Sequence, residues 1–419
     1  MIHTFTIQHQ IHDFTLVRRI AECLNVSREQ INDFIYWRGQ ADECGNNVLD
    51  EDELNFPGYH EIKLVHLRCC NSVAKRDFSQ YYIYLKLEPL TVINREKRIA
   101  LFECTCENLR RLIETFRTDM LAIIGADSGE AAGNAEIAEL IEFTTWDAQR
   151  VDYTIDVHMR NHDEVLAYMN LAKMSALSNC INEAKYTSTY GKNFRNHTYK
   201  YGNKTWELQI YDKEAQFAKK KDKYEPEHFQ RLLADCRNIA RIEYRRLTNG
   251  TKKASTNLES RNIMEFMRED LAHSWLMECY ENTIGFEDFY RTYHMEKLLD
   301  KAFPMNDVEI REENRRAKQA QESGNDEYKP ETHSKKFYLY RKHLMNIAIH
   351  KGMQGALNAE LKGLSGTERA SAKRKFTDRN KAIRQSVGIS PILIPDAWKT
   401  KRLMDLPTDF LRNPIKPQS

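Results

Sequence analysis

The sequence predicts an α+β protein in which one sheet domain lies between mostly helical ends. Strand patterns alternate with helical patterns from about residue 60 to residue 255, which indicates a domain built around a sheet. Beyond residue 255 the strand patterns fade and helical ones dominate. A chain of 419 residues has room for two or three domains, and we place them at 1–57, 58–256 and 257–419.

The composition is that of a soluble globular protein, with 41% hydrophobic and 30% charged residues. No apolar run approaches the ~20 residues of a membrane span, and Met1–Phe5 lacks the blocks of a signal peptide, so we expect a cytoplasmic protein. The nine cysteines form no C-x-x-C pair, which favours reduced thiols without zinc. Since the net charge is only +2, a nucleic-acid surface requires local clustering of basic residues.

The N-terminal region predicts a strand over residues 1–8 and two helices with a turn between them over Leu16–Trp37. Ser27 and Gln30 form a capping box at the start of the second helix. The pair is either a helix-turn-helix that presents Arg28, Glu29 and Asn32 to DNA, or a plain helical hairpin. Residues 41–57 are acidic and irregular, as in a linker.

The remaining elements follow from periodicity and turn residues. We expect strands at 61–68, 80–95, within 141–157, and at 199–211 (a hairpin) and 239–247. We expect helices at 100–124, 162–184, 213–223, 226–238, 262–303, 337–362 and 371–388. Residues 125–134 predict a flexible connection, and 309–335 predict a linker or an exposed helix ending in a loop.

The strand at residues 206–213 delivers a tyrosine to its end. Glu207, Gln209 and Tyr211 alternate with apolar residues, so the polar side chains share one face. A Gly-Asn pair at 202–203 predicts the preceding hairpin turn. A tyrosine at such a strand exit is either an ordinary surface residue or a nucleophile.

Two other strands carry polar side chains in the same alternation. One face presents Asp152, Thr154 and Asp156 in the first strand and Arg241, Glu243 and Arg245 in the second. If the three strands are neighbours, carboxylates and arginines surround Tyr211. The same spacing also suits cross-strand ion pairs on a solvated face.

Clustered carboxylates usually recruit a hard divalent cation, so we expect Mg²⁺ or Mn²⁺. Such a cation polarises a phosphoryl oxygen. A tyrosine hydroxyl, with a pKa near ~10, attacks poorly unless a metal or basic neighbour assists it. Carboxylates, metal, arginines and a tyrosine together suit a phosphodiester transesterification.

The three strands resemble those of rolling-circle replication initiators. The strings Arg-Val-Asp-Tyr-Thr-Ile-Asp at 150–156, Ile-Tyr-Asp-Lys-Glu at 210–214 and Arg-Ile-Glu-Tyr-Arg at 241–245 are similar to plasmid initiators of the Rep_trans type and to filamentous-phage replication endonucleases. The resemblance covers about 61–246, and Phe337–Lys342 resembles a C-terminal piece of the phage enzymes. It implies an antiparallel sheet of the HUH-endonuclease type. The His-x-His pair of that group is missing; the nearest spacings are His9/His12 and His158/His162.

The resemblance implies that Tyr211 is the nucleophile that forms a 5′-phosphotyrosine link while it nicks an origin strand. It makes Asp152 and Glu243, with Asp156, the metal ligands. His158 is either an assisting residue or an ordinary loop histidine. The expected partners are single-stranded or hairpin origin DNA in a bacterial host cell, together with a host helicase and DNA polymerase. The alternatives are a conjugative relaxase with the same chemistry and a non-enzymatic DNA-binding repressor or initiator.

Basic residues around the three strands are candidates for contacts with DNA phosphates. They are Arg150, Lys200, Lys204, Lys213, Arg241 and Arg245. The basic segment 373–384 is a further candidate, although a solvated helix face has the same pattern. Aromatic residues interleaved with basic ones at 192–204 suit the stacking of single-stranded bases.

Overall fold

The computed structural model describes residues 1–23, 54–56, 59–69, 81–96, 99–175, 198–256, 258, 260–285 and 287–395. The chain divides into two compact units. The first unit comprises Met1–Asp156, Gly202–Arg237 and Arg241–Glu278, and the second comprises Val157–Tyr201, Asn238–Ala240 and Cys279–Ser419. The expected division at residues 57 and 256 stays a prediction.

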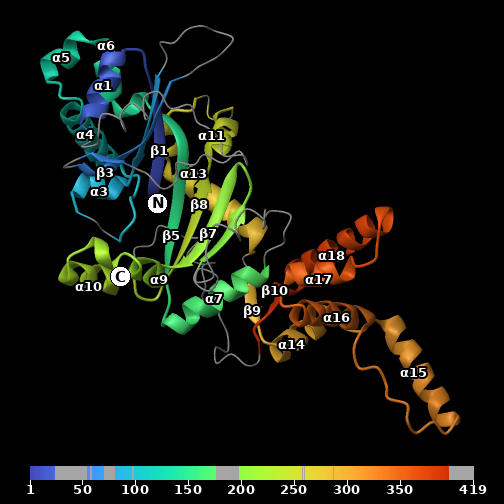
Figure 1. Ribbon diagram of the computed structural model, residues 1–419. Helices are drawn as coiled ribbons and strands as arrows, with labels where there is room; N and C mark the ends of the chain where they lie inside the picture. Colours follow the sequence, from blue (N-terminus) through green and yellow to red (C-terminus); the bar gives the residue numbers. More distant parts are fainter. Residues whose placement is uncertain are drawn as a thin grey trace. The chain divides into compact units, whose positions relative to one another are not determined.

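The predicted α+β class is confirmed, with a sheet of eight strands among the described residues. Their order is β2-β3-β4-β1-β5-β8-β7-β6, and Figure 1 shows β1, β5, β8 and β7 side by side. The strands are β1 (Ile2–Ile11), β2 (Leu54–Phe56), β3 (Tyr59–Cys69), β4 (Tyr81–Leu87), β5 (Asp147–His158), β6 (Thr198–Gly202), β7 (Trp206–Asp212) and β8 (Ile239–Arg246). The pairs β2–β3, β3–β4, β4–β1 and β1–β5 are antiparallel.

Strand β1 lies inside the sheet, between β4 and β5. Phe5 is opposite Leu87 on one side and Val151 on the other. The strand predicted for residues 1–8 is therefore confirmed and extends to Ile11. It is followed by α1 (Phe14–Glu22), the first helix of the predicted helix-turn-helix. The second helix of that motif and the 41–57 linker lie outside the described residues, apart from β2.

The first unit contains other helical elements, of which the sequence predicts those within 106–123, 213–235 and 263–283 but not those within 89–94, 128–145 and 248–255. They are α3 (Pro89–Asn94), α4 (Cys106–Ile123), α5 (Ser128–Gly133), α6 (Ala135–Ile141), η2 (Phe143–Thr145), α9 (Lys213–Ala218), η5 (Lys221–Lys223), α10 (Pro226–Asp235), α11 (Thr248–Ser255), α12 (Ile263–Phe266) and α13 (Glu269–Thr283). Helix α4 begins where the Thr105 hydroxyl accepts a hydrogen bond from the Asn108 backbone. Its apolar stripe of Leu112, Phe116 and Met120 is buried.

Two predictions in this region were wrong. The strand expected at 80–95 ends at Leu87, because Pro89 lacks a backbone donor and opens α3 instead. The connection expected to be flexible at 125–134 contains α5, whose N-terminus is capped by the Asp127 carboxylate.

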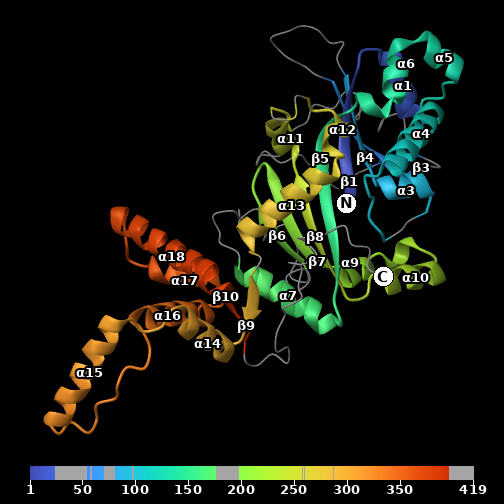
Figure 2. The same cartoon turned by 180° about the vertical axis from the view of Figure 1, so that it is seen from behind.

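One face of the sheet is covered by α12 and α13, as Figure 2 shows for α13. On this face the Tyr153 hydroxyl donates to the Phe266 carbonyl at 2.9 Å, and its ring contacts Trp275 edge-on. The Arg246 guanidinium lies 3.7 Å from the centre of the Trp275 ring. Since neighbouring residues of a strand point to opposite faces, Asp152 and Arg245 lie on the other face.

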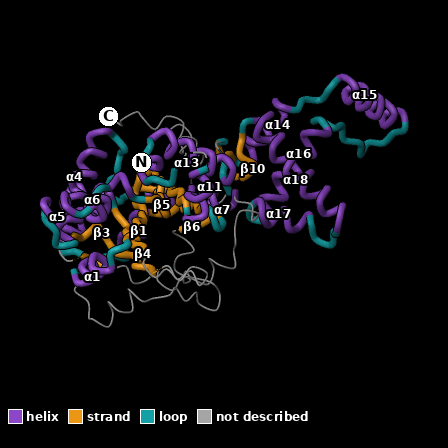
Figure 3. Tube along the Cα trace, turned by 90° about the horizontal axis from the view of Figure 1, so that it is seen from above, coloured by secondary structure: helices purple, strands orange, loops and turns teal. Residues whose placement is uncertain are grey.

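The second unit contains α7 (His162–Ser175), α14 (Thr292–Ala302), α15 (Asp307–Glu322), α16 (Lys335–Ile349), α17 (Met353–Glu360) and α18 (Gly366–Val387). Helices α14, α16 and α18 pack around a core that includes Met295, Leu344 and Ile383 (Figure 3). A short parallel pair, β9 (Asp288–Tyr290) and β10 (Ile389–Leu393), was not predicted. The predicted exposed helix within 309–335 is α15. Residues 176–184 of the helix predicted at 162–184 lie outside the described residues.

Candidate active site

The centre of the polar face is a contact between Tyr211 on β7 and Glu243 on the neighbouring β8. The Tyr211 hydroxyl donates a hydrogen bond to Oε2 of Glu243 at 3.0 Å. Tyr211 is 1% exposed and Glu243 is fully buried. The tyrosine that the sequence singled out is thus held against a carboxylate rather than lying on the surface.

Arg245 joins this pair to two further carboxylates. Its Nε donates to Oε1 of Glu243 at 2.5 Å, and its Nη1 donates to Oε1 of Glu207 at 3.0 Å. The same Nε lies 3.7 Å from Oδ2 of Asp152. Asp152 is also held by Arg150, whose Nε and Nη2 donate to its two oxygens at 2.7 and 2.6 Å. Three carboxylates from three adjacent strands therefore surround one guanidinium.

The cationic side chains form the solvent side of this cluster. The side chains of Arg150 and Arg245 are 30% and 20% exposed, whereas those of Asp152 and Glu243 are 1% and 0% exposed. A negatively charged ligand that approaches from solvent therefore meets guanidinium groups before it meets carboxylates.

Asp156 and Arg241 form a separate pair, in which the side chains are 13% and 1% exposed. Nε and Nη2 of Arg241 donate to the two oxygens of Asp156 at 2.5 and 2.6 Å, and Nη2 also donates to the Ile99 carbonyl. Arg241 is fully buried. Both oxygens of Asp156 are therefore engaged with Arg241, as both oxygens of Asp152 are with Arg150.

Burial and neighbouring charges shift the pKa values of the cluster. Burial and the adjacent Glu243 raise the pKa of the Tyr211 hydroxyl well above its ordinary value. Burial alone would raise the pKa of Glu243, but Arg245 and His3 outweigh it and lower that pKa well below its usual range. In this arrangement Glu243 is ionised and Tyr211 keeps its proton.

Lys213, which follows β7, was also expected to contact DNA. It is 5% exposed, and its Nζ lies 6.0 Å from the centre of the Tyr211 ring. Burial, with a further contribution from the positive charge of Arg241, lowers the pKa of Lys213 to about 7.

His3 on β1 is a site residue that the sequence did not reveal. Its Nδ1 lies 3.6 Å from Oε2 of Glu243, the oxygen that accepts the Tyr211 hydrogen bond. The register shift between Ile2 and Thr4, where β1 pairs with β5, accompanies this placement. The pairing of β1 with β5 spans more than a hundred residues, and no local pattern around His3 indicates it.

The donor set suits a divalent cation, although the described residues contain no group of three or more His, Cys, Asp or Glu side chains already arranged to hold one. Oxygen atoms predominate, as hard cations require. The Oγ1 of Thr154 and the Oε1 of Gln209 lie on the same face, are buried, and have no hydrogen-bond partner among the described residues. Glu207, Glu243 and Asp152 already gather around a positive charge, that of Arg245.

The remaining candidates for DNA contact lie on the β6–β7 hairpin, on α18 and at the end of β5. Lys204 is exposed in the β6–β7 turn, and Lys200 is half-buried on β6. The basic segment 373–384 forms part of α18, which carries seven basic and two acidic residues. Residues 366–371 and 373–375 of this helix are all exposed, so its N-terminal half is surrounded by solvent on nearly every side. His158 is exposed at the end of β5.

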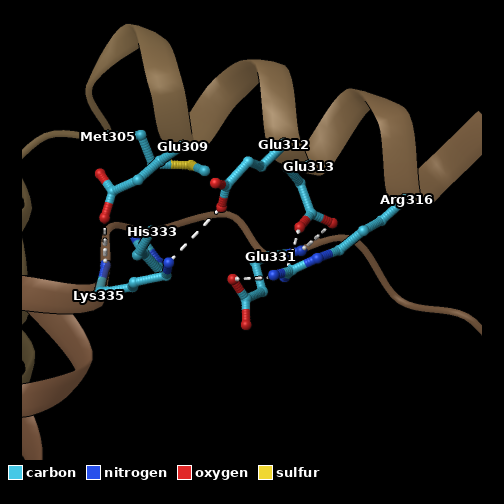
Figure 4. Close-up of a pocket in the computed structure, with 8 residues that line it drawn as sticks. All are labelled: Met305, Glu309, Glu312, Glu313, Arg316, Glu331, His333 and Lys335. Atoms are coloured by element: carbon cyan, nitrogen blue, oxygen red, sulfur yellow. Dashed lines mark hydrogen bonds and ion pairs between the residues drawn. The ribbon is translucent and has the colours of Figure 1, made fainter.

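A second polar cluster, on α15, has a structural role. Figure 4 shows that Arg316 lies between Glu313 and Glu331, and that Lys335 lies beside Glu309 and Glu312. Oε1 of Glu313 also accepts hydrogen bonds from the Tyr328 hydroxyl and the Glu331 backbone. These contacts hold segment 323–334 against the helix.

The fold and the site define a sheet protein with a buried tyrosine, carboxylates and arginines on three adjacent strands. Residues 104–278 match the Phage_CRI family, which is described as the N-terminal part of a replication-associated protein. This match includes β5, β7 and β8, and it confirms the resemblance to filamentous-phage-type replication initiators over that segment. No curated protein and no solved structure matches the chain.

Proposed function

We propose that this protein initiates rolling-circle DNA replication by nicking one strand of an origin and rejoining it later. The observation that carries the proposal is the contact of Tyr211 with Glu243, which is linked through Arg245 to Asp152. These are the residues that the resemblance to replication initiators makes nucleophile and metal ligands. They lie within the segment that matches the replication-associated family.

In the proposed reaction the Tyr211 oxygen attacks a DNA phosphorus atom. A bond forms between that oxygen and phosphorus, and the bond from phosphorus to the 3′ oxygen breaks. The hydroxyl proton passes to water, and the leaving 3′ oxygen takes a proton from water. Glu243, whose pKa is lowered, orients the hydroxyl through its hydrogen bond and stays ionised. The products are a free 3′-OH, which serves as a primer, and a 5′-phosphotyrosine. The reverse reaction rejoins the strand without ATP, because the phosphotyrosine ester preserves the energy of the broken phosphodiester bond.

Asp152 and Glu243, with Glu207 beside them, are the residues that would hold Mg²⁺ or Mn²⁺. When bound, the cation would offset negative charge on the phosphoryl group. Asp156, which the resemblance also makes a ligand, remains a further candidate, because Arg241 donates to both of its oxygens just as Arg150 donates to both oxygens of Asp152. Arg150 and Arg245, at the solvent side, would orient the phosphate through paired N–H donors.

The proposed partner is origin DNA, with α18 and the β6–β7 turn as contacts to its backbone. A host helicase and DNA polymerase would act on the nicked origin, and this part of the proposal rests on the resemblance alone. None of the described helices is long and apolar enough to cross a membrane.

A covalent-adduct assay tests the proposal. Labelled single-stranded oligonucleotides that tile the replicon carrying the gene are incubated with the protein and Mn²⁺, then separated on a denaturing gel. We expect wild type and Tyr153→Phe to form an adduct and Tyr211→Phe to form none. Tyr153 is a matched control, because it is an equally buried tyrosine on the opposite face of the sheet.

Two outcomes contradict the proposal. An adduct with Tyr211→Phe would remove Tyr211 as the nucleophile. A wild type that binds the oligonucleotides but never forms an adduct would favour a non-enzymatic DNA-binding protein. A relaxase would also form the adduct, and it is distinguished by cleaving a transfer origin rather than a replication origin.

A further inference from the structure

Arg245 occupies the place in the carboxylate cluster where a cation is needed. Its guanidinium contacts Glu243, Glu207 and Asp152, which come from three different strands. Carboxylates gathered in a buried site repel one another, and in this structure Arg245 is the cation that they share.

A divalent cation would compete for the same oxygen lone pairs. Mg²⁺ binds oxygen at about 2.0–2.1 Å and requires a near-octahedral arrangement, which leaves no room for an N–H donor along the same direction. Oε1 of Glu243 and Oε1 of Glu207 accept hydrogen bonds from Arg245. These are oxygens that a cation would need.

Arg245 also has a route out of the cluster. Its side chain is 20% exposed, whereas the carboxylates of Glu243 and Glu207 are 0% and 7% exposed. A long side chain at the solvent side can turn outward without unpacking the sheet, and an outward guanidinium suits a phosphate, to which it can donate two parallel hydrogen bonds.

We propose that Arg245 and the divalent cation exchange places: the cation displaces the guanidinium from Glu207 and Glu243, and the freed Arg245 binds the DNA phosphate. The resident arginine thus keeps the carboxylates neutralised until metal arrives, and metal binding delivers a phosphate-binding group to the site. This inference rests on the proposed function, since it concerns the same carboxylates.

The test measures Mn²⁺ binding in the absence of DNA, by the loss of the free-ion electron paramagnetic resonance signal. The full chain is compared with Arg245→Gln, Arg245→Lys and Arg246→Gln at constant ionic strength. Arg246 is the matched control: its replacement removes the same charge one residue further along β8, but its guanidinium stacks on Trp275 on the opposite face. Circular dichroism verifies that each variant is folded.

We expect Arg245→Gln to bind Mn²⁺ at least about tenfold more tightly than wild type, because a competing positive charge has been removed from the site. Arg245→Lys should lie between the two, and Arg246→Gln should stay within about twofold of wild type. Where an adduct forms, Arg245→Gln should form it more slowly than wild type even at saturating Mn²⁺.

Equal or weaker Mn²⁺ binding by Arg245→Gln would overturn the exchange, as would a gain of equal size in Arg246→Gln. Neither result bears on whether Tyr211 forms an adduct, so the failure of this inference is distinguishable from the failure of the proposed function. If Arg245→Gln fails to fold, the comparison of Arg245→Lys with wild type decides the question in the same way.

Discussion

The hydroxyl of Tyr211 lies 3.0 Å from Oε2 of Glu243 and donates a hydrogen bond to it. The two residues come from adjacent strands and are 32 positions apart in the chain. This contact places the hydroxyl that we propose as the nucleophile, a carboxylate that we propose as a metal ligand, and the surrounding arginines within one buried cluster. The chemistry and the stability of the first unit both depend on how the charges of that cluster are balanced.

We expect the protein to lose much of its stability when one partner of the Arg241–Asp156 pair is removed. Replacing Arg241 with Met leaves Asp156, whose side chain is only 13% exposed, without its partner, and we expect the free energy of unfolding to fall by about 3 kcal/mol. Arg110→Ala is the control, because its ion pairs with Glu107 and Glu114 are exposed on α4 and should contribute far less to stability. Urea unfolding of the two variants provides the measurement; equal losses would contradict the assignment of a buried pair.

We expect buried Lys213 to make the free energy of unfolding depend on pH. Its pKa is about 7 in the folded protein and near its ordinary 10.5 when unfolded, so between these values the unfolded chain binds the extra proton. The free energy of unfolding therefore rises with pH across this window. Below pH 7 the folded protein carries the whole destabilisation that comes from burying a charged lysine. We expect Lys213→Met to be more stable than wild type by roughly 4–5 kcal/mol at pH 6, with less than about 1 kcal/mol of that difference remaining by pH 10.

Urea unfolding at pH 6, 8 and 10 measures this difference for Lys213→Met. Lys221→Met is the control, since Lys221 is exposed in η5 and its replacement should change stability equally little at each pH. A Lys213→Met variant that is less stable than wild type at pH 6 would show that the ammonium group is stabilised by a partner rather than destabilised by burial.

Much of the candidate site follows from strand alternation alone. A period of two places Asp152, Glu243 and Tyr211 on the polar side of their strands, and the Gly-Asn turn predicts the hairpin that leads to Tyr211. Alternation does not tell how deep a side chain lies. Arg241 and Arg245 share a face in the sequence pattern, yet Arg241 is fully buried against Asp156 while Arg245 reaches solvent.

The parts that were missed depend on contacts between distant segments. His3 reaches Glu243 only because β1 pairs with β5, and nothing near residue 3 indicates that partner. Strands β9 and β10 form a parallel pair of three and five residues, too short to interrupt the helical patterns around them. The boundary of α3 was missed because strand-forming residues resume directly after Pro89, at Thr91, Val92 and Ile93.

Gly352, in the second unit, lies where a larger side chain would not fit. It precedes α17 with φ +129°, and a Cβ there would lie 2.8 Å from the Met174 carbonyl oxygen on α7. We expect Gly352→Ala to destabilise this unit by about 2–4 kcal/mol, through both the backbone conformation and the clash. Gly363 also has positive φ but nothing within 4 Å, so Gly363→Ala should cost only about 1 kcal/mol. Thermal unfolding measures the stability of the two variants. Equal losses would show that the α7 backbone at Met174 moves away from the added methyl group.

We expect helix α18 to contribute a salt-dependent contact with DNA. Replacing Lys373, Arg374 and Lys375 with Ala removes three exposed cations, and we expect weaker binding and a reduction of about 2–3 in the slope of log K against log salt. The control replaces Arg311, Arg315 and Lys318 on α15, a helix with five acidic and four basic residues. Fluorescence anisotropy with duplex and single-stranded DNA measures both; equal losses would indicate a general charge effect rather than a contact at α18.

The most direct test of the account is to locate the covalent bond. Wild-type protein is trapped on its nicked oligonucleotide, digested with nuclease and protease, and analysed by mass spectrometry. We expect a nucleotide attached through phosphate to the tyrosine of the peptide that contains residues 206–212, with the DNA fragment on the other side of the nick ending in 3′-OH. A nucleotide attached to any other tyrosine, or cleavage products with no attached peptide, would contradict the claim that Tyr211 is the nucleophile.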